Sequence, residues 1–436
     1  MKKSVFIVFI FCTINVFAQN IGNMGKLPVI ETPKPPNPYQ AQINCQPVNP
    51  YNPNELTEIQ KRNNEIIMSD AEGINSEIQR QTAIKMLIEN GFPSQAYQDT
   101  VGTNYFYRAF DEINAMLKGE KPLNLGRAVF LVENAFYGNK LDYSEYQSFI
   151  NHKVALCKQK IKDEKLDGNN NLVKNMMLFR LISDTLKFKN TGTEKASVHL
   201  PIKYDYVDYE SKEQYDSHFV TKLMRSGVGQ CYSMPLYYLV LAEAIGADAY
   251  WAFSPHHSFI KIKDEKGSWY NIELTCGAIL SDAHYMNSSY IKAEAIRHKL
   301  YLEPMDKRNV VAEMLTTLAR NYYVRYGFDN FCLQCADTAE QYLDNKLEPF
   351  MLKSEYETRL TLTLANLLNT QNPEILKQKS PEAYRHYEKM KELYQQIDDL
   401  GYEELPDALY AKWLDYIAKQ KEISEQNKTL LQNEIR

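Results

Sequence analysis

One cysteine of this chain stands where a nucleophile would be expected. Cys231 follows Gly229 and opens a strongly apolar stretch that ends at Gly246. Pro235 has no backbone N–H to donate, so it fits best in the first turn of a helix, which places the helix start close to Cys231. At a helix N-terminus the dipole and the unpaired N–H groups favour thiolate over thiol, and a thiolate is the form that attacks carbonyl carbon.

A histidine and a glutamate follow at positions that could complete this chemistry. Three short runs have the composition of strands, at residues 249–253, 258–262 and 268–274. A hairpin of the last two, centred on Glu265, would set His257 directly opposite Glu273, close enough for imidazole and carboxylate to hydrogen bond. A slip of one residue would put the two side chains on opposite faces, so the predicted Cys-His-Glu triad depends on this register.

A buried helix and a small sheet are needed to hold these three residues. The segment 236–245 is apolar on nearly every side, which predicts a helix at the centre of a domain. The strands that follow would pack on it. The sequence therefore predicts an α+β core in which the nucleophile lies at the start of a central helix, packed on antiparallel strands.

Three segments in this order resemble the three motifs of the transglutaminase-like superfamily, which shares a papain-like thiol core. They are Gly-Gln-Cys at 229–231, His-Ser-Phe-Ile-Lys-Ile at 257–262 and Trp-Tyr-Asn-Ile-Glu at 269–273. The resemblance covers roughly residues 195–300, about a quarter of the chain. Its third motif usually carries Asp rather than Glu, and the Cys-to-His interval here is short for members that crosslink proteins. The resemblance thus implies a trimmed, bacterial exported member.

The resemblance also implies a role for each residue. Cys231 matches the nucleophile, His257 the general base and Glu273 the acid that orients the imidazole. The Cys231 N–H would contribute to an oxyanion hole, supported by Gly229 and Gln230. Three residues are expected as neighbours of the site: His256, Trp269 and Cys276. Of the two adjacent histidines, the second is preferred as the base because the family's small-then-aromatic pattern begins after it.

The other cysteines give weaker signals. Cys276 could join the neighbouring histidines and glutamate in a zinc site, but that spacing matches no known finger or ribbon, so we expect no metal and no cofactor. Cys332 and Cys335 form a C-x-x-C motif without a second copy. It predicts either a local disulfide or two core thiols on one helix. Seven Cys in 436 residues are too few for a disulfide scaffold.

The flanks of the predicted core are helical, and the N-terminus carries an export signal. Residues 1–18 read as a signal peptide, with two lysines and then a short apolar run, and residues 19–53 form a linker that holds eight prolines. Apolar spacing of three and four predicts an N-terminal helical region over 54–190 and C-terminal helical hairpins over 306–436, on either side of a core domain at 191–305. We expect a secreted or periplasmic protein that is not inserted in a membrane after signal removal.

The net charge of the chain limits the classes of partner that it could bind. The formal net charge is −5 and the chain has no long basic patch, so no nucleic-acid partner is expected. The favoured function is a cysteine hydrolase or acyl transferase that acts on amide bonds of peptides or proteins, with hydrolysis favoured over transfer to an amine. The alternative is a non-catalytic helical scaffold that binds a peptide or protein through a degenerate thiol-protease-like domain. A sulfur far from the His257 ring, or a site plugged by side chains, would favour the scaffold.

Overall fold

The computed structural model describes residues 58–93, 102–189, 196–288 and 291–403, with 408, 409, 412, 414–416, 418 and 419. The predicted signal peptide, residues 1–18, and the proline-rich linker, residues 19–53, lie outside the described residues. Among the described residues, no helix combines the length and apolar character needed to cross a membrane.

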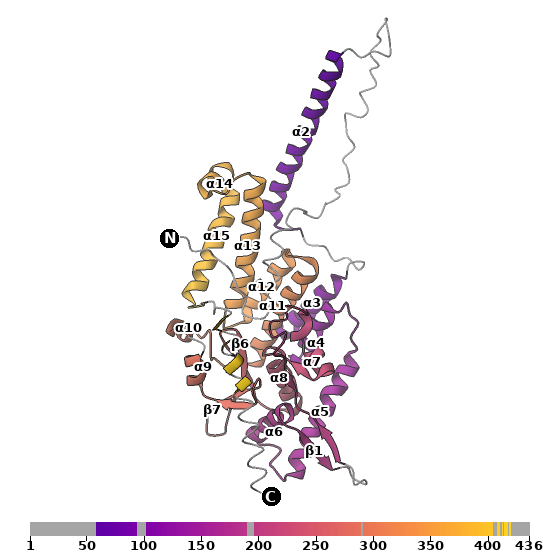
Figure 1. Cartoon of the computed structure of the whole chain (residues 1–436), viewed down its shortest axis with the longest axis vertical. Helices are drawn as coiled ribbons and strands as arrows, with labels where there is room; N and C mark the ends of the chain where they lie inside the picture. Colours follow the sequence, from indigo (N-terminus) through magenta and orange to yellow (C-terminus); the bar gives the residue numbers. More distant parts are fainter. Residues whose placement is uncertain are drawn as a thin grey trace.

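Helices dominate both ends of the described chain, and the strands lie between them (Figure 1). The N-terminal helices are α2 (Glu58–Asn90), α3 (Asn104–Lys118), α4 (Leu125–Phe136), α5 (Tyr143–Asp163) and α6 (Asn171–Ser183). The C-terminal helices are α11 (Lys307–Tyr326), α12 (Asn330–Tyr342), α13 (Leu347–Leu367), α14 (Pro373–Lys379) and α15 (Pro381–Asp399). Together with small, mostly antiparallel sheets, they give the α+β class that the sequence predicts.

Side-chain caps set several of the helix starts. Asn124, Asp142 and Asn170 each accept backbone N–H bonds at the N-termini of α4, α5 and α6. Such caps satisfy donors that a helix end leaves without a partner. The starts of these three helices are therefore encoded locally, by the polar residue that precedes each of them.

The middle of the chain carries the strands and the central helix. Two short pairs are β1 (Leu186–Lys189) with β2 (Ala196–His199), antiparallel, and β3 (Lys203–Tyr204) with β4 (Val228–Gly229), parallel. Between β3 and β4 in the chain lie the 3₁₀ helix η2 (Tyr215–His218) and α7 (Val220–Ser226). The helix α8 (Ser233–Ile245) follows and ends at Gly246, whose φ of 76° only glycine adopts at little cost.

A four-stranded antiparallel sheet follows α8 in the described chain. Its strands, in spatial order, are β5 (Tyr250–Ser254), β6 (His257–Lys263), β7 (Trp269–Glu273) and β8 (Ala278–Leu280). Two short helices, α9 (Asp282–Ser288) and α10 (Ala293–Arg297), complete the region. The predicted strands are thus present, and β8 is an addition that the sequence reasoning did not include.

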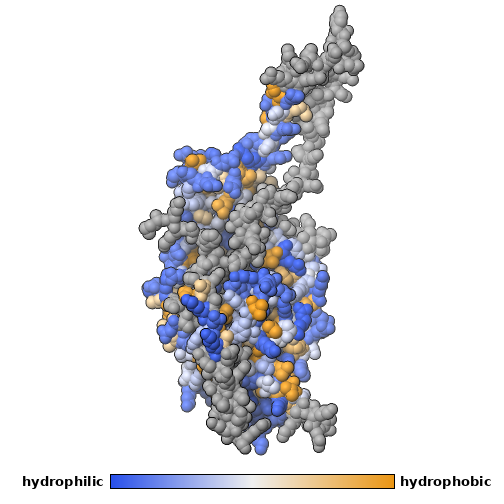
Figure 2. All heavy atoms as spheres, viewed as in Figure 1, coloured by the Kyte–Doolittle hydropathy of each residue, from blue (hydrophilic) through white to orange (hydrophobic). Residues whose placement is uncertain are grey.

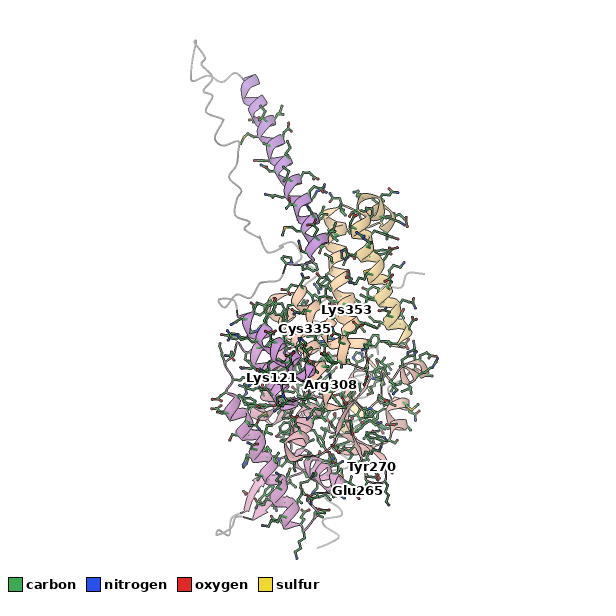
Figure 3. The ribbon with its side chains drawn as sticks, turned by 180° about the vertical axis from the view of Figure 1, so that it is seen from behind. Lys121, Glu265, Tyr270, Arg308, Cys335 and Lys353 are labelled. Carbon is green, nitrogen blue, oxygen red and sulfur yellow. The ribbon has the colours of Figure 1, made fainter. Side chains whose placement is uncertain are left out.

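The predicted hairpin register is wrong by two residues. Lys263 pairs with Trp269, and the turn runs through residues 264–268 rather than being centred on Glu265. The physical reason lies in the turn, where the Asp264 carboxylate accepts the N–H groups of residues 266 and 268 and Gly267 takes a φ of 87°. Glu265 and Tyr270 mark this end of the hairpin in Figure 3. A shift of two residues leaves every side chain on its predicted face.

The central helix lies inside one large hydrophobic core. Helix α8 contacts α4, α5, α6 and α7 as well as the strands β5 and β6. Its core includes Phe106 of α3, Trp251 of β5 and Leu315 of α11, all fully buried. This core therefore extends across residues 190 and 305, where the sequence places the limits of the central region.

The long helix α2 projects away from this body (Figure 1). Only its C-terminal part packs, through Ile84 against Tyr356 and Leu360 of α13. Apolar spheres interrupt the hydrophilic surface where the helix projects, and Ile67 and Ile74 are among the exposed side chains there (Figure 2).

Candidate active site

The nucleophile candidate lies at the entrance to the central helix. Cys231 stands two residues before the first residue of α8. Gly229, in β4, is closely packed, because a Cβ there would lie 2.5 Å from Leu223 Cδ1 and 2.8 Å from Met234 Cγ and would force these side chains to shift. The Ser258 hydroxyl of β6 donates to the Cys231 carbonyl oxygen at 2.5 Å. Close packing of β4 and this hydrogen bond fix the backbone of the cysteine relative to the sheet.

The histidine and glutamate of the predicted triad meet in the sheet. His257 Nε2 lies 2.7 Å from Glu273 Oε2, although the two residues are diagonal rather than directly opposed. The imidazole also has the Cys231 side chain as a hydrogen-bond partner. The structure thus brings Cys231, His257 and Glu273 together in one constellation.

Electrostatics in this constellation favour charge separation. Burial alone would lower the pKa of His257, but the Glu273 carboxylate and the hydrogen bonds to Cys231 and Glu273 raise it to about 10. Burial would raise the pKa of Glu273, but His257 and the hydrogen bonds from Thr275 outweigh it and hold that pKa below its usual value. The favoured state of the pair is therefore imidazolium with carboxylate.

A fourth residue, absent from the sequence prediction, supports the glutamate. Tyr285 of α9 donates its hydroxyl to Glu273 Oε2 at 2.9 Å, and the Thr275 N–H donates to Oε1 at 2.9 Å. The Tyr285 ring stacks on Phe259 with centroids 4.0 Å apart. No motif in the sequence marks Tyr285, because its position depends on how α9 folds back onto the sheet.

Helix α9 is itself anchored to the sheet. Asp282, its first residue, accepts hydrogen bonds from the Lys261 ammonium and the Asn271 amide, both at 2.7 Å. Lys261 and Asn271 pair directly across β6 and β7. This clamp fixes the start of α9, so the Tyr285 hydroxyl one turn later reaches the carboxylate.

The predicted supporting residue Gln230 faces away from the thiol. Its Nε2 donates to the Asp208 carbonyl oxygen at 2.5 Å, and its Oε1 accepts from the Ser211 hydroxyl at 2.9 Å. The side chain is fully buried. Gln230 therefore connects the residue before the nucleophile to the loop of residues 205–214.

The three predicted neighbours differ in their placement. His256 adopts a left-handed φ of 56°, and its carbonyl oxygen lies 4.0 Å from Cys231 Sγ. Cys276 is buried in the turn after β7, where it adds to the effects of burial and Glu273 that raise the pKa of Tyr285. Trp269 is not brought to the site. It starts β7, four residues from the glutamate, and is 41% exposed.

The triad is closed to solvent. Cys231 and His257 are each 1% exposed, and Glu273 is 0% exposed. The 2.7 Å contact between His257 and Glu273 is what a catalytic site requires, whereas the burial is the feature expected of a plugged site. The burial therefore meets one of the two conditions predicted for a scaffold.

The C-x-x-C motif is not a disulfide. Cys332 and Cys335 are both buried thiols on α12, so of the two predicted alternatives the pair of core thiols is the one observed. Burial raises the pKa of both thiols, which keeps them protonated. In the described part of the chain, no group of three or more His, Cys, Asp or Glu side chains could hold a metal ion.

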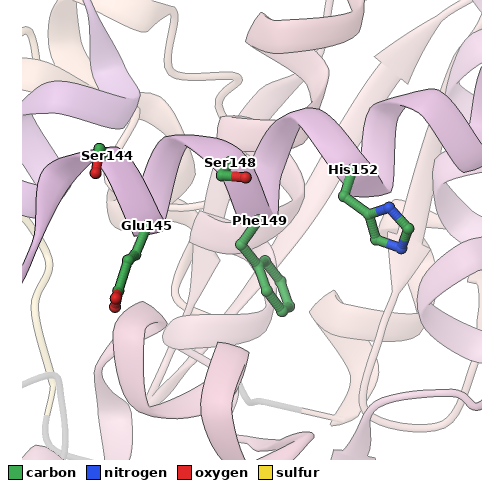
Figure 4. A pocket seen from close by; sticks show the side chains of 5 residues that line it. All are labelled: Ser144, Glu145, Ser148, Phe149 and His152. Carbon is green, nitrogen blue, oxygen red and sulfur yellow. The ribbon is translucent and has the colours of Figure 1, made fainter.

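A shallow hollow lies elsewhere, along α5 (Figure 4). Its lining residues are Ser144, Glu145, Ser148, Phe149 and His152. All come from one face of a single helix, and none belongs to the predicted triad. The hollow therefore lacks the convergent groups from several elements that a catalytic site needs.

Comparison of the chain with family models, with curated proteins and with solved structures finds no match.

Proposed function

We propose that this protein is an exported cysteine hydrolase of the transglutaminase-like type, with a papain-like core, that cleaves amide bonds of peptides or proteins. The observation that carries the proposal is the His257 imidazole, whose Nε2 lies 2.7 Å from Glu273 Oε2 and whose pKa is raised by both Glu273 and the Cys231 side chain. A nucleophile, a base and a group that orients the base are the parts that thiol catalysis needs.

The proposed reaction has two steps. The Cys231 sulfur attacks the amide carbonyl carbon, and His257 gives the former thiol proton to the departing amine, so that a thioester and a free amine form. His257 then takes a proton from water, which attacks the thioester and releases a carboxylic acid while the thiol is restored. Glu273 stays ionised and stabilises the imidazolium throughout. An amine in place of water would give acyl transfer, which we hold as the less favoured outcome.

Activity-based labelling tests the proposal. The full chain is treated near neutral pH with a thiol-directed acylating probe, and the modified residue is identified by peptide mapping. We expect rapid labelling at Cys231 in the wild type and none in Cys231→Ala. Cys335→Ala is the matched control, because burial raises the pKa of that thiol and keeps it protonated, so its loss should leave labelling unchanged. Equal, slow labelling of all thiols in the native protein would contradict the proposal.

The burial of the triad supports one second candidate, a non-catalytic scaffold that binds a peptide or protein. In that case the same labelling experiment gives no preferred site, and Cys231→Ala leaves every measurable property of the protein other than its stability unchanged. Hydrolysis of an unfolded polypeptide substrate that is lost in Cys231→Ala would exclude the scaffold as the whole function.

A further inference from the structure

The loop of residues 205–214, between β3 and η2, is fastened to both sides of the triad. On one side the Gln230 side chain, next to the nucleophile, makes two hydrogen bonds to Asp208 and Ser211. On the other side the Tyr206 hydroxyl donates to the Thr275 carbonyl oxygen at 3.4 Å. The N–H of Thr275 binds the Glu273 carboxylate. The loop therefore bridges the residues that flank the nucleophile and the acid.

The loop is braced internally and so would move as one unit. The Asp205 carboxylate accepts the N–H groups of Val207 and Asp208, at 3.0 Å each. The Asp208 carboxylate accepts the N–H groups of Glu213 and Gln214, also at 3.0 Å. These bonds lie within the loop and do not depend on its contacts with the triad side.

One residue of the loop is held in a costly backbone conformation. Ser211 has a φ of 52°, a left-handed value that a residue with a Cβ adopts at a cost, and it is nearly fully buried. Its hydroxyl is the group that binds Gln230. Release of this hydrogen bond would let the backbone relax, so the strain favours opening of the loop.

The outer side of the loop meets solvent while the inner side is sealed. Val207 is 85% exposed, whereas Gln230 beneath the loop is fully buried. The two bonds that Gln230 makes use one carboxamide donor, to a main-chain carbonyl, and one acceptor. A peptide main chain offers the matching pair, a C=O and an N–H.

We propose that the loop of residues 205–214 is a flap, and that a peptide substrate displaces it and binds the Gln230 carboxamide with its own main chain. The inference rests on the proposed function for the identity of the substrate. The flap itself can be tested without any turnover, because an open flap exposes the Cys231 sulfur.

The test measures the rate at which iodoacetamide alkylates Cys231 in the native full chain, by peptide mapping. Tyr206→Phe and Ser211→Ala each remove one hydrogen bond that holds the flap closed. Each variant should alkylate about two- to ten-fold faster than the wild type, and the double variant should show roughly the product of both factors. Tyr270→Phe is the matched control, since its hydroxyl makes an exposed hydrogen bond to Asp264 at the far end of the hairpin.

Thermal unfolding and peptide mapping of each variant together separate flap opening from a general loss of stability. Only a general loss of stability would also expose Cys157 and Cys335 to the reagent. Unchanged alkylation in both flap variants would overturn the proposal, as would wild-type alkylation as fast as in guanidinium-unfolded protein. Faster alkylation of the variants together with no hydrolysis of an unfolded polypeptide would support the flap and contradict the proposed function. Hydrolysis with a higher KM but similar kcat in Gln230→Ala supports the peptide contact, whereas an unchanged KM refutes it.

Discussion

Replacement of Tyr285 by Phe isolates a contact that the sequence does not reveal. The change keeps the ring that stacks on Phe259 and removes only the hydroxyl that donates to Glu273 Oε2. Hydrogen bonds to charged groups contribute about 1.5–3 kcal/mol each, and the fully buried carboxylate has no water to replace the lost donor. We therefore expect the free energy of unfolding to fall by about 1.5–3 kcal/mol.

The pH dependence distinguishes this role from simple packing. The folded pKa of Glu273 is lowered, so its ionised form stabilises the protein above the unfolded pKa and this stability is lost as the pH falls through the folded pKa. Loss of the Tyr285 donor raises the folded pKa, so in Tyr285→Phe the acid loss of stability begins at a higher pH.

Denaturant unfolding at several pH values, and the labelling rate at Cys231 over the same range, measure this effect. We expect labelling about ten-fold slower at neutral pH, because the imidazole is less firmly held. Tyr270→Phe, which loses an exposed hydrogen bond to Asp264, should change neither the stability nor the labelling rate. A Tyr285→Phe protein with wild-type stability and a wild-type acid limb would refute the reasoning.

Two further changes test the charges around the core. In Glu273→Gln the largest effect that opposes the burial of His257 is lost, so the pKa of His257 falls from about 10, and labelling of Cys231 at pH 7 should drop at least about ten-fold, measured as a pH–rate profile. Wild-type labelling in this variant would contradict the ion pair. Burial and the neighbouring Glu348 raise the pKa of Glu313 to about 8, so its proton stabilises the fold below the unfolded pKa and this stability is lost as the pH rises through 8. Glu313→Gln should therefore be more stable than wild type at pH 9 by a few kcal/mol, up to about 5, and equal to it at pH 5, in denaturant titrations. Equal stabilities at pH 9 would show that the fold does not raise the pKa of Glu313.

Much of the site could be predicted because its signals are local. The apolar run that follows Cys231, the helix-ending Gly246 and the turn residues near 264–267 fix a helix and a hairpin in order along the chain. The histidine and glutamate then lie on the same face of the sheet. The fold could be predicted as α+β for the same reason, whereas the register could not, because it depends on how the Asp264 carboxylate caps its turn.

The contacts that could not be predicted all join distant segments. Tyr285 reaches Glu273 only because Asp282 is clamped to the sheet, and Gln230 turns toward the loop that holds Ser211 rather than toward the thiol. Trp269 was expected beside the site because it belongs to the same strand motif as the glutamate. A strand rises about 3.3 Å per residue, so four residues separate the Cα atoms of Trp269 and Glu273 by about 13 Å.

The two-residue change in register gives a reason for glutamate at the third position. Residues directly opposed in a hairpin have Cβ atoms about 4.5–5.5 Å apart, whereas diagonal neighbours lie about 7–8 Å apart. His257 and Glu273 are diagonal, and the hydrogen bond between them is nevertheless 2.7 Å long. The additional methylene of glutamate covers part of that extra distance, which a shorter aspartate would not. The glutamate and the turn through residues 264–268 are therefore matched features of one geometry. A change in either one alone would weaken the contact between His257 and the acid.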